Sequence, residues 1–249
     1  MGKKIKVQRF LQDPACCAIA GIATVANYYN ENIDYKITKL ITKKKLTNNL
    51  KEGLESGEMR SLLNCLGFKT VIMISSDVDY LDYTWSGFSK KKMIDKLQEV
   101  CAVSRERLRP RSIMKWLSEK SFNNRLIIDY NFGDYIRTDI DNGIPVIVTF
   151  NWTIFFRQCR EIKRRFDDIQ GEYEDHCVVI YSYNDKGVKI CDSHNECYRY
   201  KLKNYKSGFY FMSWENLMTC VGFGDIFLVR DYDETIFEKT KKEINGRST

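Results

Sequence analysis

Apolar residues recur at helical spacing through most of the first half of the chain. Residues 15–29, ACCAIAGIATVANYY, combine small and apolar side chains, follow Pro14 and end before Asn30, which predicts a buried helix. The same periodicity predicts further helices at 36–46, 58–66, 90–102 and 110–120. We therefore expect residues 1–122 to be mainly helical.

After residue 123 the pattern changes to short runs of β-branched and aromatic residues, which are typical of strands. The predicted strands lie at 125–130, 145–150, 176–183, 188–192, 197–202, 209–212 and 225–231. The sequence NDKG at 184–187 predicts a hairpin turn between two of them. Helices are expected at 133–142, 152–168 and 213–220, and a charged tail at 233–249.

Helices first and strands second predict an α+β fold, in which a helical N-terminal half packs on a mainly antiparallel sheet at 123–232. The chain has 249 residues, of which 43% are hydrophobic and 29% charged, so it can build a substantial core. No repeat, low-complexity tract or Gly/Ser/Pro-rich linker divides it. We therefore expect a single domain over residues 1–249.

The charge pattern favours solvated basic faces, and the alternative is a surface for an anionic partner. Forty Lys and Arg against 33 Asp and Glu give a net charge of +7, but the basic residues form short scattered runs without a nucleic-acid motif. No apolar run reaches the ~18 residues of a membrane span. Basic residues followed by the apolar stretch 15–26 resemble a signal peptide, but the polar sequence QDP at 12–14 interrupts this pattern. We expect a cytoplasmic protein, with secretion as the alternative.

The nine cysteines are an odd number without a paired framework, which favours reduced thiols. Cys191, His194 and Cys197 come nearest to a metal-binding cluster. Their spacing on a predicted pair of strands is not that of a zinc finger, so no structural metal is expected.

The chain has only two histidines, His176 and His194. His176 begins a predicted strand after the polar stretch GEYED, at an end of the sheet. Asp192 ends the next strand of the same hairpin, so the two side chains can meet at one rim of the sheet. The alternative is a surface histidine, or one with satisfied hydrogen bonds, at a strand edge.

Cys16 and Cys17 lie at the start of the buried helix, where unpaired N–H groups and the helix dipole stabilise a thiolate. The amide of Gln12 could donate to a developing oxyanion beside the backbone N–H of Cys17. The alternative is that both cysteines are small buried residues that pack the helix start.

The segment QDPACCAIAGIATVANYY resembles the nucleophile segment of papain-like cysteine peptidases of the bacteriocin-processing type, which cleave after double-glycine leaders. Four further segments resemble that family in the same order: GEMRSLLNCLGFKTVIM, DIDNGIPVIVTF, HCVVIYSYNDKGVKICDS and MSWENLMTCVGFGDIFLV. Counting back from residues 27–29, NYY, the family's nucleophile falls on Cys17 and not on Cys16. Ala18, Ser182 and Ser193 stand where the family has Gly, Gly and Pro.

The resemblance implies a papain-like fold with Cys17 as nucleophile and His176 as its base. Asp192 would orient the imidazole, and Gln12 with the Cys17 N–H would stabilise the oxyanion. No metal or organic cofactor is implied, and the substrate would be a peptide or protein. His194 would be a bystander or rim residue, and the alternative is that it acts as the base. Trp152 either lines the cleft or packs behind it.

The segment 157–175 is longer and more charged than the loop usual in the family, which makes it a candidate lid or partner surface. We expect its basic part, 157–165, to form a solvated helix face, and the alternative is a docking site for a protein. Three functions remain open. The first is a thiol hydrolase that cleaves a peptide or isopeptide bond through a thioester. The second is a glutamine deamidase or transglutaminase-like effector with the same triad. The third is a catalytically silent binding module, in which Ala18 and Ser193 mark a lost site.

Overall fold

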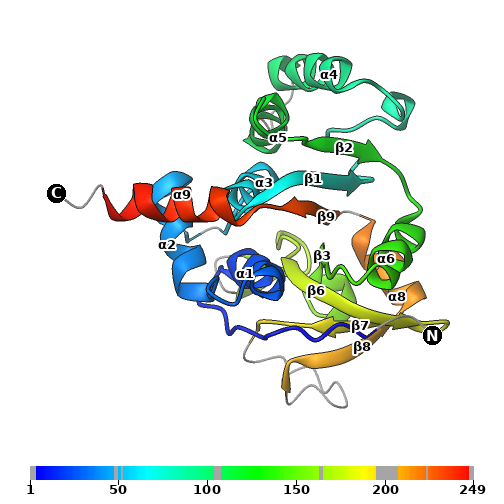
Figure 1. Ribbon diagram of the computed structural model, residues 1–249. Helices are drawn as coiled ribbons and strands as arrows, with labels where there is room; N and C mark the ends of the chain where they lie inside the picture. The colour runs from blue at the N-terminus through cyan, green and yellow to red at the C-terminus, as the bar shows by residue number, and fades with distance from the viewer. Residues whose placement is uncertain are drawn as a thin grey trace.

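The computed structural model describes residues 4–47, 50–51, 53–103, 108–162, 165–194, 207–222 and 224–246. Over these residues seven strands form one sheet in the order β2-β1-β9-β3-β6-β7-β8, in which the β1–β2 pair is parallel and the other pairs are antiparallel (Figure 1). The strands are β1 (Phe68–Ser75), β2 (Arg125–Ile128), β3 (Val146–Asn151), β6 (Asp175–Asn184), β7 (Gly187–Cys191), β8 (Phe209–Ser213) and β9 (Asp225–Tyr232). The protein is therefore a mixed α/β fold with a large, mostly antiparallel sheet.

The helices surround this sheet. They are α1 (Cys17–Tyr29), α2 (Tyr35–Lys45), α3 (Ser56–Cys65), α4 (Lys90–Val103), α5 (Leu108–Ser118), α6 (Phe132–Asp141), α7 (Trp152–Phe156), α8 (Trp214–Val221) and α9 (Glu234–Asn245), with a short 3₁₀ turn η1 (Tyr83–Trp85). The helices expected at 15–29, 36–46, 58–66, 90–102, 110–120, 133–142 and 213–220 are confirmed to within a few residues.

Two apolar clusters cover the two faces of the sheet. Residues of α1, α3, α5 and α9 pack in one cluster, and residues of α6 and α8 pack in the other. The neighbours Val178 and Val179 on β6 belong to different clusters, because successive side chains of a strand point to opposite faces. The sheet is thus buried on both sides, and its strand ends are the places where polar side chains can reach a cleft.

Helix α1 lies tightly against β6 because its residues are small. A Cβ atom added at Gly21 would lie 3.0 Å from Sγ of Cys177, which is closer than an ordinary contact. The close approach brings the first turn of α1, with Cys17, next to the start of β6, with His176.

The segment that precedes α1 runs along the β6–β7 hairpin. A bulge between Ile180 and Ser182 shifts the register of this hairpin and leaves Tyr181 out of the pairing. The Tyr181 carbonyl instead accepts a hydrogen bond from the Ile5 N–H at 2.9 Å. The bulge therefore helps to anchor the N-terminal segment that carries Gln12.

The structure departs from the sequence prediction in two places. Strand β1 lies within residues 1–122, which were expected to be mainly helical, and it inserts between β2 and β9. The helix predicted over 152–168 is wrong: α7 ends at Phe156, Arg157 adopts a left-handed conformation with φ 50°, and the short strands β4 (Glu161–Ile162) and β5 (Arg165–Phe166) follow. Because the chain turns at Arg157, the charged residues that follow do not share one face of a helix.

Of two other predicted segments, one lies outside the described residues and the other is described as far as residue 246. The strand predicted at 197–202 lies outside the described residues. Within the segment expected as a charged tail at 233–249, helix α9 buries Phe237 and Ile244 in the core, so its charged residues occupy the outer side of an amphipathic helix.

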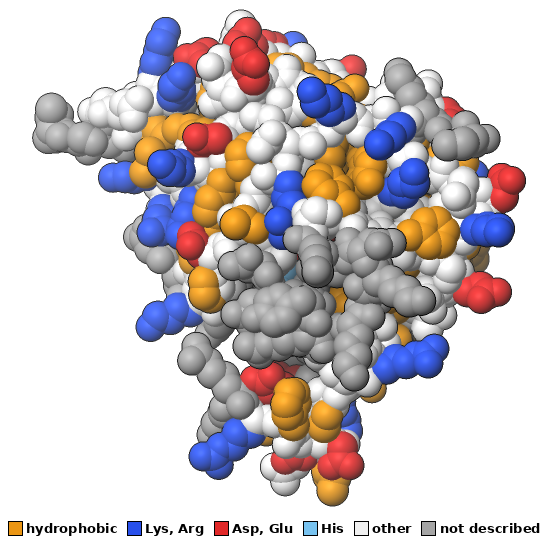
Figure 2. All heavy atoms as spheres, turned by 90° about the horizontal axis from the view of Figure 1, so that it is seen from below, with side chains coloured by type: hydrophobic (Ala, Val, Ile, Leu, Met, Phe, Trp, Pro, Cys, Tyr) orange, Lys and Arg blue, Asp and Glu red, His pale blue; other side chains and the backbone are white. Residues whose placement is uncertain are grey.

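On the face shown in Figure 2, the visible Lys and Arg side chains are spread apart from one another, with Asp and Glu side chains between some of them. None of the helices formed by the described residues combines the length and the apolar character that a bilayer crossing requires.

Candidate active site

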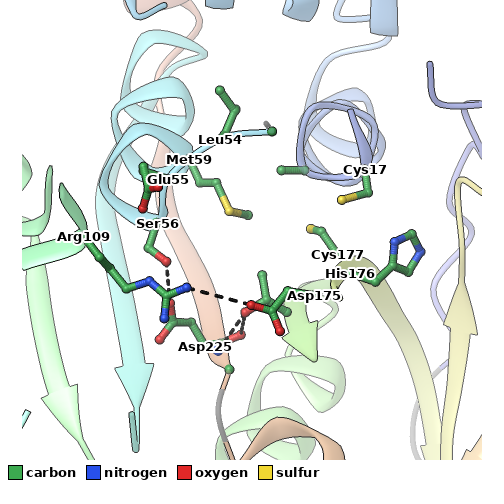
Figure 3. A pocket seen from close by; sticks show the side chains of 14 residues that line it. Cys17, Leu54, Glu55, Ser56, Met59, Arg109, Asp175, His176, Cys177 and Asp225 are labelled. Carbon is green, nitrogen blue, oxygen red and sulfur yellow. Dashed lines mark hydrogen bonds and ion pairs between the residues drawn. The ribbon is translucent and has the colours of Figure 1, made fainter. Parts of the chain in front are cut away.

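The candidate site lies where the first turn of α1 meets the start of β6, and the two cysteines there have different surroundings (Figure 3). Cys16 occupies the N-cap position of α1 without a side-chain capping hydrogen bond. It is only 3% exposed, and burial raises the pKa of its thiol. Cys17 is the first helical residue, is half-buried, and lines the cavities on both sides of it. Cys17 is therefore the thiol that a substrate could reach.

His176 and Asp192 lie close together, as the hairpin pattern predicts. Nε2 of His176 is 2.8 Å from Oδ1 of Asp192, and both side chains are buried. His176 lies at the start of β6 and Asp192 directly follows β7, so the antiparallel hairpin brings both to one edge of the sheet. Cys17 lines the same two cavities as His176, and its thiol contributes to raising the pKa of this imidazole.

The surroundings of His176 favour its charged form. Burial opposes the imidazolium, but the charge and hydrogen bond of Asp192, with a further hydrogen bond to Cys17, raise the pKa of His176 to about 10. The Trp152 ring stands edge-on to the imidazole with 4.1 Å between centroids. Trp152 both packs on His176 and lines the adjoining cavity, so the two roles expected for it coexist.

Asp192 is held by several donors besides His176. The backbone N–H of His194 donates to Oδ1 at 2.8 Å, and the Tyr210 hydroxyl donates to Oδ2 at 3.1 Å. Burial alone would raise the pKa of Asp192, but the His176 charge and these hydrogen bonds outweigh it and lower the pKa. Asp192 is thus a fixed carboxylate at neutral pH.

Gln12 reaches the site through a pair of contacts with Ser193. Its backbone N–H donates to the Ser193 carbonyl at 3.1 Å, and the Ser193 hydroxyl donates to Oε1 of Gln12 at 2.7 Å. The side-chain NH₂ of Gln12 then remains to donate to another acceptor. Gln12 lines the same cavity as Cys17 and His176, where an oxyanion would need a donor.

Two residues that hold this site were not found from the sequence. The Arg9 guanidinium donates to the carbonyls of Asp192, at 2.6 Å, and of His194, at 2.8 Å. Tyr210, on β8, holds the carboxylate of Asp192. Neither residue carries a local sequence signal, because each contact joins segments that are distant in the chain.

The remaining candidates lie around the site or outside it. The His194 ring is 5.9 Å from that of His176 and 5.0 Å from that of Trp152, and it lines the Gln12 cavity. Among the described residues, no group of three or more His, Cys, Asp and Glu side chains is arranged to hold a metal ion. Cys197, the third member of the cluster considered from the sequence, lies outside the described residues.

Comparison with known proteins identifies the family of this chain. The model of a family described as Peptidase_C39 like matches residues 4–220. No curated protein matches the chain. The chain is also similar to a solved protein from Bacillus anthracis that is provisionally named a C39-like peptidase, with 14% identity, a TM-score of 0.43, and coverage of 94% of this chain and 100% of that one. Because the family model spans most of the sequence, from before Gln12 to beyond Asp192, the chain belongs to the Peptidase_C39 like family.

Proposed function

We propose that the protein is a papain-like cysteine hydrolase that cleaves a peptide or isopeptide bond. Membership of the C39-like family indicates cysteine peptidase activity at the level of the family. The observation that carries the finer proposal is the placement of the half-buried Cys17 beside His176, which is paired with Asp192. A thiol at a helix N-terminus beside a buried imidazole with its own carboxylate is the arrangement of an activated nucleophile.

Each residue of this line would have one role. The Cys17 thiolate attacks the substrate carbonyl, and the C–S bond forms while the carbonyl electrons move to oxygen. The Gln12 amide and the Cys17 N–H stabilise that oxyanion. As it collapses, the C–N bond breaks and the imidazolium of His176 protonates the leaving amine, which leaves a thioester. Water, deprotonated by His176, then hydrolyses the thioester and releases the acid.

The departures from the family pattern are compatible with this activity. Ser193, which stands where the family has Pro, donates the hydrogen bond that orients Gln12. Ala18 is a buried residue of α1 that belongs to the main apolar cluster, so it contributes packing and removes no polar group from the site. Both positions support an intact site rather than a lost one.

A peptide library analysed by mass spectrometry tests the proposal. The parent protein should generate new termini in the library, and Cys17→Ala should generate none. Cys16→Ala is the matched control and should retain cleavage. A mass increase of one dalton in glutamine-containing peptides, without cleavage, would instead indicate a deamidase. Identical products from the parent and Cys17→Ala would contradict any role of this thiol.

A further inference from the structure

We propose that the cavity beside Cys17 receives a positively charged side chain of the substrate, that of lysine or arginine. This inference deepens the proposed function and rests on it. It concerns the cavity that lies away from Gln12, between α1, the start of α3 and the end of β3.

The cavity has the size of a subsite for one side chain. Its volume is about 190 Å³, and Cys17 and His176 form one end of it. Figure 3 shows Met59 and Leu54 on one wall, and Ser56, Arg109, Asp175 and Asp225 at the end away from α1. A substrate bound at Cys17 could therefore place a neighbouring side chain among these polar groups.

Carboxylates dominate the lining of this region. Glu55, Asp175 and Asp225 line the cavity itself, and an adjoining cavity that shares Asp175 adds Asp77 and Asp79. Among the described residues that line the two cavities, Arg109 is the single Lys or Arg. The region is thus negative in a chain whose net charge is +7, which favours a cationic ligand.

The two nearby arginines are already matched by carboxylates. Arg109 lies 2.7 Å from Asp77 and 3.8 Å from Asp175. Burial opposes its charge, but Tyr80 and the carboxylates around it raise the pKa of Arg109, so it stays charged. Arg60 is fully buried against the rings of Trp116 and Phe227, with one amino group 3.3 Å from Asp225, and its Nε and Nη1 have no hydrogen-bond partner among the described residues. It does not line the cavity, so neither guanidinium presents an unpaired positive charge there to an acidic substrate.

Asp225 gives a second, independent indication of a donor ligand. Its side chain is more than nine-tenths buried at the cavity, and its Oδ2 accepts from the Ser56 hydroxyl at 2.8 Å and lies 3.3 Å from Arg60. Its Oδ1 has no hydrogen-bond partner among the described residues. An ionised carboxylate oxygen can only accept hydrogen bonds, so the partner it lacks is a donor, and an ammonium or guanidinium in the cavity would supply one.

Asp175 is a second carboxylate of this cavity, and it lies next to the reacting groups. It directly precedes His176, and its side chain is 53% exposed at the rim shared by the cavities. Partial removal from water raises the pKa of Asp175 to about 6 against the opposing charge of Arg109, and the carboxylates of Asp225 and Asp77 add to the rise. A cation at this rim would relieve the repulsion between these carboxylates.

Electrophilic peptide probes test the inference without a known substrate. The probes are peptidyl acyloxymethyl ketones in which the first or second residue before the ketone is Lys, norleucine, Gln or Glu. Intact-mass spectrometry measures the rate at which each probe alkylates Cys17. At one of the two positions, the Lys probe should react about tenfold faster than the uncharged norleucine probe. This ratio of rates corresponds to a difference of about 1.4 kcal/mol in free energy. Asp175→Asn and Asp225→Asn should each reduce this ratio toward one. The control Asp95→Asn, at an exposed position on α4, should leave it unchanged.

The outcomes separate this inference from the proposed function. Iodoacetamide carries no side chain, so rapid alkylation of Cys17 that depends on His176 supports the function alone. If iodoacetamide reacts in this way while Lys gives no advantage over norleucine at either position, the cavity inference is overturned. Preference for Glu would make Arg109 the recognition group, and preference for Gln would indicate a neutral amide ligand; either result also overturns it. Slow alkylation of Cys17 by iodoacetamide would contradict the function itself.

Discussion

The hydroxyl of Ser193 donates a hydrogen bond to Oε1 of Gln12 at 2.7 Å, and the backbone N–H of Gln12 donates to the Ser193 carbonyl at 3.1 Å. These contacts join the segment before α1 to the end of β7, which carries Asp192. The candidate oxyanion donor and the candidate carboxylate are thereby fixed to one another. The orientation of the Gln12 amide depends on a hydroxyl group next to the proposed triad.

Replacing that hydroxyl should impair oxyanion stabilisation. We expect Ser193→Ala to lower kcat by about tenfold, because the Gln12 amide loses one hydrogen bond that orients it, while Gln12→Ala should cost about 100-fold to 1,000-fold. Ser193→Thr keeps the hydroxyl and should retain most activity. Alkylation of Cys17 by iodoacetamide forms no oxyanion, so its rate should stay unchanged in all three variants. A parallel fall in hydrolysis and alkylation would show that Ser193 acts on the thiol or the fold instead.

The neighbouring cysteines should differ in reactivity. Cys17 lines two cavities and is half-buried, whereas Cys16 is buried with a raised thiol pKa. Brief treatment of the native protein with iodoacetamide, followed by peptide mapping, should therefore modify Cys17 first. Cys17→Ala should remove this rapid labelling and Cys16→Ala should preserve it. Faster labelling of Cys16 would move the nucleophile assignment to the other thiol.

The fold could be predicted where the sequence pattern is local. The turn at 184–187, between two apolar runs, predicted the β6–β7 hairpin, and the small residues at 15–29 predicted α1. Strand β1 was missed because its run FKTVIMIS is buried on both faces and does not alternate between polar and apolar residues. The helix predicted at 152–168 failed because its many charged residues were taken as one solvated face, whereas the chain turns at Arg157.

The candidate site could be predicted only for residues with a recognisable local setting. Cys17 at a helix start and His176 at a strand start are such settings, and the hairpin adds Asp192. Arg9 and Tyr210 contact Asp192 or its backbone through tertiary structure alone. The acidic cavity is a similar case, because Glu55, Asp175 and Asp225 come from three separate segments of the chain.

The His176–Asp192 pair should contribute to stability in a defined range of pH. We expect Asp192→Asn to lower the free energy of unfolding by about 1.5–3 kcal/mol, since charge-assisted hydrogen bonds are lost, and Tyr210→Phe to lower it by about 1 kcal/mol. Urea denaturation of the parent and both variants measures these differences.

The direction of the two pKa shifts sets that range. The lowered pKa of Asp192 gives stability that is present above the usual 3.8 and is lost as the pH falls through the folded value. The raised pKa of His176 gives stability that is complete below the usual 6.5 and is lost as the pH rises toward about 10. The difference between the parent and Asp192→Asn should therefore be largest between these usual values and smaller on both sides. A difference independent of pH would mean that Asp192 acts through packing alone.

The same imidazolium should control the pH dependence of the Cys17 reaction. Because the pKa of His176 is raised, His176 carries its proton across the neutral range and can pair with a Cys17 thiolate. Alkylation of Cys17 should consequently remain fast at pH 6, and in His176→Ala the rate should fall there and recover only at alkaline pH. The control is His194→Ala, since the contact of His194 with Asp192 comes from its backbone N–H and survives the substitution. The measurement is the second-order rate constant for iodoacetamide between pH 5 and about 9, the range in which an ordinary thiol with a pKa of about 8.5 ionises. If the two histidine variants and the parent share one profile, His176 does not activate Cys17, and the chain is better described as a binding module with a papain-like fold.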